Sequence, residues 1–144
     1  MDNHINPHMR FKQIDDLTSD VLFEAYGKDL KEVFENSALA LFTLMCKIDK
    51  VKPKKQNILY IKGKDAEDLF FNWLNELIAL VDTEEMFYSK FVIEQIDENK
   101  LKAKVFGQPI SPEIGNVVVK STTLYKFKLE KTKKGYTAMF SVDI

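Results

Sequence analysis

Apolar residues recur every three or four positions in two segments of the chain, residues 29–48 and 65–81. This spacing gathers them on one face of a helix, so the pattern predicts two amphipathic helices. Asp29 with Glu32 three positions on resembles a capping box at the first helix start. The apolar stripes are Leu30, Val33, Phe34, Ala38, Leu41, Phe42, Met45 and Ile48 in the first helix, and Leu69, Phe70, Trp73, Leu74, Leu77, Ile78 and Val81 in the second.

Much of the remaining chain alternates with period two, which is typical of strands with one buried face. Turn residues at 97–99 and 133–135 separate neighbouring strands and predict hairpins. We therefore expect an α+β fold, with two helices packed on one side of a mostly antiparallel β-sheet and room for a small inserted β subdomain. Residues 1–10 are expected to be a flexible N-terminus and residues 11–144 a single domain. The predicted strands are 20–25, 57–62, 91–96, 100–105, 117–131 and 136–142.

Composition is that of an ordinary globular protein, with 45% hydrophobic and 30% charged residues. The net charge is −1, so the chain does not have the excess of basic residues that a protein binding RNA by itself usually needs. Lysines at 50, 52, 54 and 55 are expected to form a solvated loop. One cysteine, no apolar run of about 18 residues and no apolar leader segment lead us to expect a cytoplasmic protein.

Several signatures of catalysis are absent from the sequence. It has no glycine-rich phosphate loop and no Gly-x-Ser-x-Gly element. The two histidines, His4 and His8, fall in the predicted flexible N-terminus, and Cys46 lies near the apolar stripe of the first helix. We expect Cys46 to pack as a small hydrophobic residue, because no ordered histidine is available to activate its thiol.

Acidic residues are the remaining candidates for chemistry. Asp16 and Asp20 flank a short turn, and Asp143 stands beside Ile144 and its terminal carboxylate. Neighbouring carboxylates repel one another, and a hard cation such as Ca²⁺ or Mg²⁺ relieves that repulsion. On the residues alone, however, an ordinary acidic turn and an exposed terminal aspartate are the simpler interpretation. Lys120, in a predicted strand, is either an edge-strand lysine that discourages aggregation or a cation placed near these carboxylates or a partner's phosphate.

Seven motifs, in this order, resemble the archease family over about residues 11–144. They are Asp16-Leu17-Thr18-Ser19-Asp20-Val21, Ala25-Tyr26-Gly27, the segment 30–42, Trp73-Leu74-Asn75-Glu76-Leu77, Gly107-Gln108-Pro109, Val119-Lys120-Ser121-Thr122-Thr123 and Val142-Asp143-Ile144. The chain departs from the family pattern at Leu17 and Tyr125, where the family usually has histidine, and at Gln108, where it has glutamate.

The resemblance implies a non-catalytic protein cofactor of an RNA-splicing ligase. Such a cofactor promotes guanylylation and repeated turnover of the ligase that joins 3′-phosphate or 2′,3′-cyclic phosphate RNA ends to 5′-hydroxyl ends. Transfer RNA would then be contacted indirectly, through the ligase. The resemblance also implies that Asp20, Asp143 and the carboxylate of Ile144 bind a divalent cation, with Ca²⁺ as the first candidate. It places Lys120 and Asp16 in the same functional patch.

Two other functions remain open at this point. One is a metal-dependent phosphohydrolase or nuclease built on the same carboxylates, although such an enzyme needs a general base or metal-bound water in a formed pocket. The other is an RNA-binding or chaperone-like module, against which the neutral charge balance argues.

Overall fold

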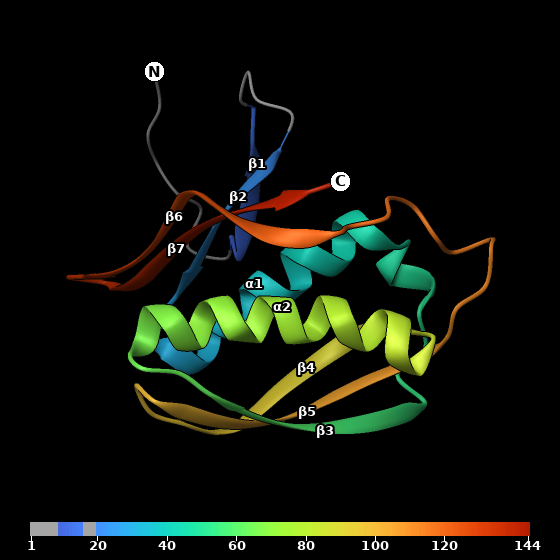
Figure 1. Ribbon diagram of the computed structural model, residues 1–144, viewed down its shortest axis with the longest axis horizontal. Coiled ribbons are helices and arrows are strands. Elements are labelled where there is room, and N and C mark those ends of the chain that lie inside the picture. Colours follow the sequence, from blue (N-terminus) through green and yellow to red (C-terminus); the bar gives the residue numbers. More distant parts are fainter. Residues whose placement is uncertain (1–8, 16–19) are drawn as a thin grey trace.

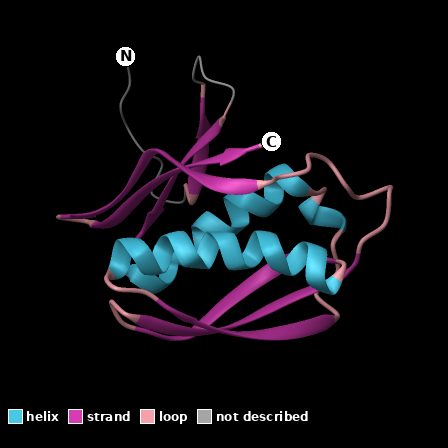
Figure 2. Cartoon of the chain, in the orientation of Figure 1, coloured by secondary structure: helices cyan, strands magenta, loops and turns pink. Residues whose placement is uncertain are grey.

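The computed structural model describes residues 9–15 and 20–144, which form three layers (Figure 1). A four-stranded antiparallel sheet has the strand order β1-β2-β7-β6, and a three-stranded antiparallel sheet has the order β3-β5-β4. Both helices lie between the two sheets (Figure 2). The elements are β1 (Phe11–Ile14), β2 (Val21–Gly27), α1 (Leu30–Met45), the 3-10 turn η1 (Ile48–Lys50), β3 (Lys55–Lys62), α2 (Ala66–Glu84), β4 (Met86–Ile96), β5 (Lys100–Pro109), β6 (Ser121–Thr132) and β7 (Gly135–Asp143).

The predicted α+β class, with two helices and antiparallel strands, is confirmed. The strands divide between two sheets, and the smaller one comes from residues 55–109, with α2 inserted between its first two strands. Each helix contacts strands of both sheets, so each buries apolar side chains on two sides. Within the described residues, neither helix is long and apolar enough to span a membrane.

Both helices begin with the same cap. The Asp29 side chain accepts a hydrogen bond from the Glu32 N–H at 2.9 Å, and Asp65 accepts one from the Asp68 N–H at 2.8 Å. The side chains of Glu32 and Asp68 reach back, one residue further than in a standard capping box, to the N–H groups of Lys28 and Lys64. These contacts satisfy backbone donors that a helix start leaves without partners.

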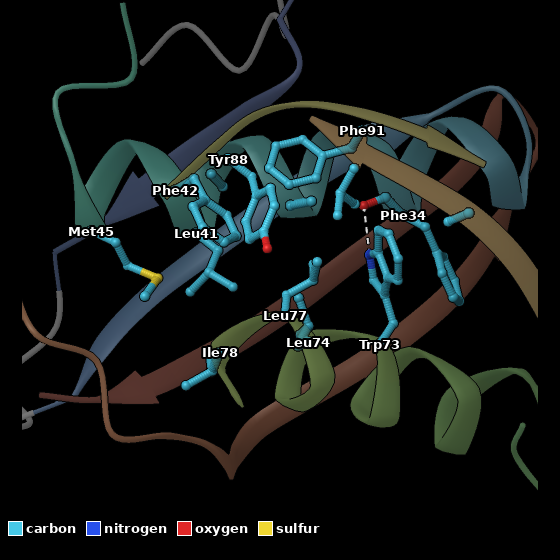
Figure 3. Packing of buried hydrophobic residues seen from close by; sticks show 14 of the residues in the cluster. Phe34, Leu41, Phe42, Met45, Trp73, Leu74, Leu77, Ile78, Tyr88 and Phe91 are labelled. Atoms are coloured by element: carbon cyan, nitrogen blue, oxygen red, sulfur yellow. Dashed lines mark hydrogen bonds between the residues drawn. The ribbon is translucent and has the colours of Figure 1, made fainter. Parts of the chain in front are cut away.

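The core fills the space where the two helices face each other (Figure 3). Trp73 of α2 is fully buried, stacks on Phe34 of α1 with ring centroids 6.4 Å apart, and donates its indole N–H to the Phe34 carbonyl at 3.0 Å. Phe42 of α1 packs against Tyr88 and Phe91 of β4. The predicted apolar stripes therefore meet one another and both sheets.

The prediction of one strand over residues 117–131 is wrong at its beginning. β6 starts at Ser121, so Lys120 lies just before the strand and not inside it. The N–H groups of Asn116 and Val117 instead donate to the carbonyls of Met45 and Leu44, which are unpaired acceptors at the end of α1. The alternation also breaks within β6, where the pairing with β7 shifts between Thr123 and Lys128. A short strand, β1, was not predicted.

The hairpin between β6 and β7 depends on a glycine. Gly135 has φ +133°, and a Cβ built on it would lie 2.2 Å from the carbonyl oxygen of Gly27. A side chain is excluded there both by backbone conformation and by the close approach of β2. The close contact between Gly135 and Gly27 packs β7 against β2 at one end of these strands. The candidate site lies at the opposite end.

Candidate functional site

Three of the predicted site residues, Asp20, Lys120 and Asp143, lie where β2, β7 and β6 end together. Val21 pairs with Val142, and Asp20 directly precedes this pair while Asp143 directly follows it. Ser121 pairs with Asp143 on the other side. The backbone N–H of Lys120 donates to the Asp143 carbonyl at 2.8 Å, and the Lys120 side chain is exposed. Residues about a hundred or more positions apart in the chain are thus brought to one end of the sheet, which is called the sheet edge below.

Two hydroxyl groups that the sequence analysis did not single out as site residues join this edge. The Thr123 hydroxyl donates to the Asp20 carboxylate at 3.0 Å and also shares a hydrogen bond with the Ser141 hydroxyl. Each hydroxyl carries one proton, so when Thr123 donates to Asp20 the Ser141 proton is divided between the Thr123 hydroxyl and the Tyr125 carbonyl oxygen. We call Asp20, Thr123, Ser141 and Asp143 the carboxylate–hydroxyl cluster. Spacing could have found Ser141, which lies two residues before Asp143 and so shares its face of β7.

An irregularity in β6 shapes the cluster. Lys126 has φ +52°, a left-handed conformation that is uncommon outside glycine, and lies within the shift of pairing after Thr123. The Tyr125 carbonyl oxygen comes within 2.9 Å of the Ser141 hydroxyl, which is fully buried. Leu124 is 75% exposed. Bulges of this kind redirect side chains and are frequent beside functional sites.

The motif around Trp73 contributes to the site through Asn75. Its side-chain oxygen accepts the N–H of Thr122 at 3.0 Å. β6 is an edge strand, so this contact covers an edge donor and fixes the start of β6 to α2. The Thr122 hydroxyl is buried and has no hydrogen-bond partner among the described residues.

The Gly107-Gln108-Pro109 motif belongs to the other sheet. A Cβ on Gly107 would lie 1.8 Å from the Phe87 carbonyl oxygen, so only glycine fits. The Gln108 side-chain oxygen accepts the N–H of Lys52 at 2.6 Å and holds the loop before β3. Glutamine keeps the acceptor that a glutamate would offer here, so this departure from the family pattern is compatible with the structure.

The remaining candidates are placed as follows. Asp16 lies outside the described residues, as do Leu17, His4 and His8. Cys46 is buried, and desolvation raises the pKa of its thiol to about 12, which confirms the expected packing role. Within residues 9–15 and 20–144, no three His, Cys, Asp or Glu side chains form a metal-ligand group. The donors at the sheet edge are carboxylate and hydroxyl oxygens, the ligand type that Ca²⁺ and Mg²⁺ prefer.

The fold and this edge define a small two-sheet α+β protein with a carboxylate–hydroxyl cluster at one end of its larger sheet. A sequence model of the Archease protein family (MTH1598/TM1083) matches residues 11–144. The chain belongs to the archease family.

Individual relatives agree along nearly the whole chain. It is 39% identical to the protein archease of Archaeoglobus fulgidus over 139 residues, covering 94% of this chain and 100% of the relative. It is 37% identical to that of Sulfurisphaera tokodaii over 131 residues, covering 88% of this chain and 94% of the relative.

Two solved structures resemble it as well. The solution structure of Methanobacterium thermoautotrophicum protein 1598 has a TM-score of 0.79 and 31% identity, covering 93% of this chain and 98% of that one. The crystal structure described as an archease, possible chaperone, from Thermotoga maritima has a TM-score of 0.65 and 20% identity, covering 96% of this chain and 100% of that one, and supports the fold alone.

Proposed function

We propose that this protein is a non-catalytic cytoplasmic activator of an RNA-splicing ligase. It would promote guanylylation and multiple turnover of the enzyme that joins 3′-phosphate or 2′,3′-cyclic phosphate ends to 5′-hydroxyl ends. The observation that carries the proposal is that Asp20, Lys120 and Asp143, which the family resemblance singles out, come together at one sheet edge in a chain matched by the family over residues 11–144.

Asp20 and Asp143, with the carboxylate of Ile144, would hold a divalent cation, for which Ca²⁺ is the first candidate. The hard oxygen donors of the edge fit such an ion. The Thr123 hydroxyl, which also contacts Ser141, holds one oxygen of the Asp20 carboxylate in place. A bound cation would supply positive charge that attracts the phosphate groups of the nucleotide or RNA bound to the ligase.

Lys120 and Asp16 would complete the patch that meets the ligase. Lys120 is held through its backbone, so its side chain is available to a partner. Large apolar side chains near the patch in sequence also face solvent, with Val118 at 81% and Leu124 at 75% exposed. Exposed apolar groups beside charged ones are common at protein–protein contacts.

Ligation by the cognate ligase tests the proposal. With GTP, a divalent metal and cleaved RNA, catalytic amounts of this protein should convert a single turnover into many, and the protein alone should ligate nothing. Asp20→Asn, which keeps an acceptor for Thr123, should abolish the stimulation while the melting temperature stays nearly unchanged. Lys120→Gln should weaken it, with stability altered by no more than about 0.5 kcal/mol.

Asp49→Asn is the matched control, because Asp49 is an exposed aspartate in η1, outside the patch. It should stimulate the ligase like the unaltered protein. Equal ligase turnover with and without the unaltered protein, over a range of GTP concentrations, would show that the proposal is wrong.

Cation binding is tested separately by calorimetric titration with Ca²⁺. Asp20→Asn and Asp143→Asn should each weaken binding, and Asp49→Asn should not. A C-terminal extension, which replaces the carboxylate of Ile144 with a peptide bond, should also weaken it. Unchanged affinity in the extended protein would remove Ile144 from the ligand set.

A further inference from the structure

The outer face of the β3-β5-β4 sheet concentrates positive charge in a protein whose net charge is −1. The helices cover one face of this sheet, and no described element covers the other (Figure 1). Lys100, Lys102 and Lys104 occupy alternate positions of β5 and so point to the same side, about 6.8 Å apart along the strand. Lys90 of β4 points to this side too, beside Phe106.

Protection against aggregation does not explain these lysines. Such lysines belong on edge strands, whose backbone groups are unpaired. β5 is the central strand, paired with β3 on one side and β4 on the other. Lys100 also lies directly opposite Lys62 of β3, and like charges in directly opposed positions destabilise a sheet. The arrangement costs stability that a bound polyanion would recover.

Two aromatic rings lie among the lysines. Tyr60 of β3 is 73% exposed, and the Lys102 ammonium sits 5.8 Å from its ring centroid. The Phe106 ring lies 5.2 Å from the Lys90 ammonium. A hollow of about 350 Å³ beside Tyr60 is lined by three lysines, Lys62, Lys100 and Lys102, and by one carboxylate, that of Asp97. We call Tyr60, Lys90, Lys100, Lys102, Lys104 and Phe106 the lysine–aromatic face.

We infer that the lysine–aromatic face binds single-stranded nucleic acid, with the lysines contacting phosphates and Tyr60 and Phe106 stacking on bases. Tyr60 is exposed and Phe106 is half-buried. A positively charged surface interleaved with accessible aromatic rings is the chemistry that recognises a flexible strand of nucleotides. A duplex hides the faces of its bases and would gain only the phosphate contacts. An acidic protein would contact the same side chains, and the titrations below separate the two kinds of ligand. The inference does not depend on ligase activation, because it concerns the other sheet and the protein alone.

Glu94 gives the inference a distinctive signature. Its carboxylate lies 3.6 Å from the Lys102 ammonium and 3.5 Å from that of Lys104, and so competes with a phosphate for both. Removing this charge should therefore strengthen binding, whereas a substitution that only disturbs the fold would weaken it.

Fluorescence anisotropy of a labelled oligouridylate of roughly 12 nucleotides, titrated with the full chain at low salt, tests this face. Binding should weaken with salt, and Lys102→Gln with Lys104→Gln should lower the slope of log affinity against log salt by about 0.7 for each lysine lost. Tyr60→Ala should reduce affinity at least about five-fold. Glu94→Gln should increase affinity. Lys133→Gln with Lys134→Gln, the same charge change in the β6–β7 turn, should have a much smaller effect.

Parallel titrations separate the sources of the signal. RNA and DNA single strands should both bind, and both should bind more tightly than a duplex of equal length. If inorganic polyphosphate competes as well as the oligonucleotide and Tyr60→Ala changes nothing, the face is a general anion patch and the inference is wrong. It is also wrong if the face variants lose a protein partner while their oligonucleotide affinity stays unchanged.

Discussion

The two sheets have similar inner faces and dissimilar outer faces. Both inner faces pack apolar side chains on the helices, such as Phe140 of β7 against Phe70 and Phe91 of β4 against Phe42. On the outer side, the larger sheet ends in carboxylates and hydroxyls beside a distorted strand. The smaller sheet presents three lysines and Phe106 on alternating positions of β5, with Tyr60 beside them on β3.

The difference shows that folding constrains the residues on the inner faces of the sheets much more than those on the outer faces. The inner positions must be apolar and complementary in shape, because protein interiors are close-packed. The outer positions have no such constraint, so an unusual outer arrangement needs another explanation. Two such arrangements are the buried Ser141 beside Thr123 and Asp20 in the larger sheet, and the lysines on the central strand β5 of the smaller sheet.

The largest effect should come from Trp73→Ala. This change removes a fully buried ring from the contact between α1 and α2 and leaves the Phe34 carbonyl without its indole donor. We expect a loss of about 3–5 kcal/mol in the free energy of unfolding, measured by urea denaturation. Tyr60→Ala, which removes an exposed ring on the outer face, should stay within about 0.5 kcal/mol. Similar losses in both variants would contradict the separation of inner and outer positions.

A smaller effect is expected from Ser141→Ala in the carboxylate–hydroxyl cluster. The Ser141 side chain is fully buried, and its one hydroxyl proton is divided between two acceptors, the Thr123 hydroxyl and the Tyr125 carbonyl oxygen. Removing it should cost about 1–2 kcal/mol, since a buried polar group loses its partner. Ser121→Ala, two positions before Thr123 in β6 but exposed, is the control and should have no measurable cost. If both substitutions are neutral, the cluster makes no contribution to stability.

The apolar pattern and the turn residues were enough to predict the inner faces. Steps of three and four located α1 and α2 within a few residues, and the turns at 97–99 and 133–135 located two hairpins. The sequence left room for a small inserted β subdomain, but which strands form it could not be predicted, because alternation indicates that a strand has a buried face and not which strand it pairs with. The beginning of β6 was predicted too early because Val117 and Val119 continue the alternation, although the backbone at 116–117 hydrogen-bonds to the end of α1.

The candidate site was only partly accessible from sequence. Asp20, Lys120 and Asp143 came from a family resemblance, and only the register of β2, β7 and β6 places them at one edge. Thr123 and Ser141 escaped notice because serine and threonine in strands are ordinary. The lysine–aromatic face was equally hidden, since the alternating lysines of 100–104 are typical of any solvated strand until β5 is known to be central.

The two sheets are also anchored to the helices by different chemistry at their edge strands. Asn75 of α2 accepts the Thr122 N–H of β6, and Glu35 of α1 accepts the Ile93 N–H of β4 at 2.8 Å. The amide is neutral at every pH, whereas the carboxylate titrates. Burial raises the pKa of Glu35 above its ordinary value of 4.5, although the Ile93 N–H opposes the shift. Only the anchor of the smaller sheet should therefore respond to pH.

The smallest expected effect follows from this contrast and is tested with Glu35→Gln. In the unfolded chain Glu35 loses its proton near pH 4.5, and in the native protein it does so at a higher pH. Between these two values the unfolded state binds fewer protons, so the Glu35 contribution to stability falls as pH rises through that window. Glutamine keeps an oxygen acceptor for Ile93 but does not titrate, so the variant should gain stability relative to the unaltered protein as pH rises from about 4. Urea denaturation at a series of pH values measures this difference. A Glu35→Gln difference that is constant with pH would show that the Glu35 carboxylate titrates alike in both states.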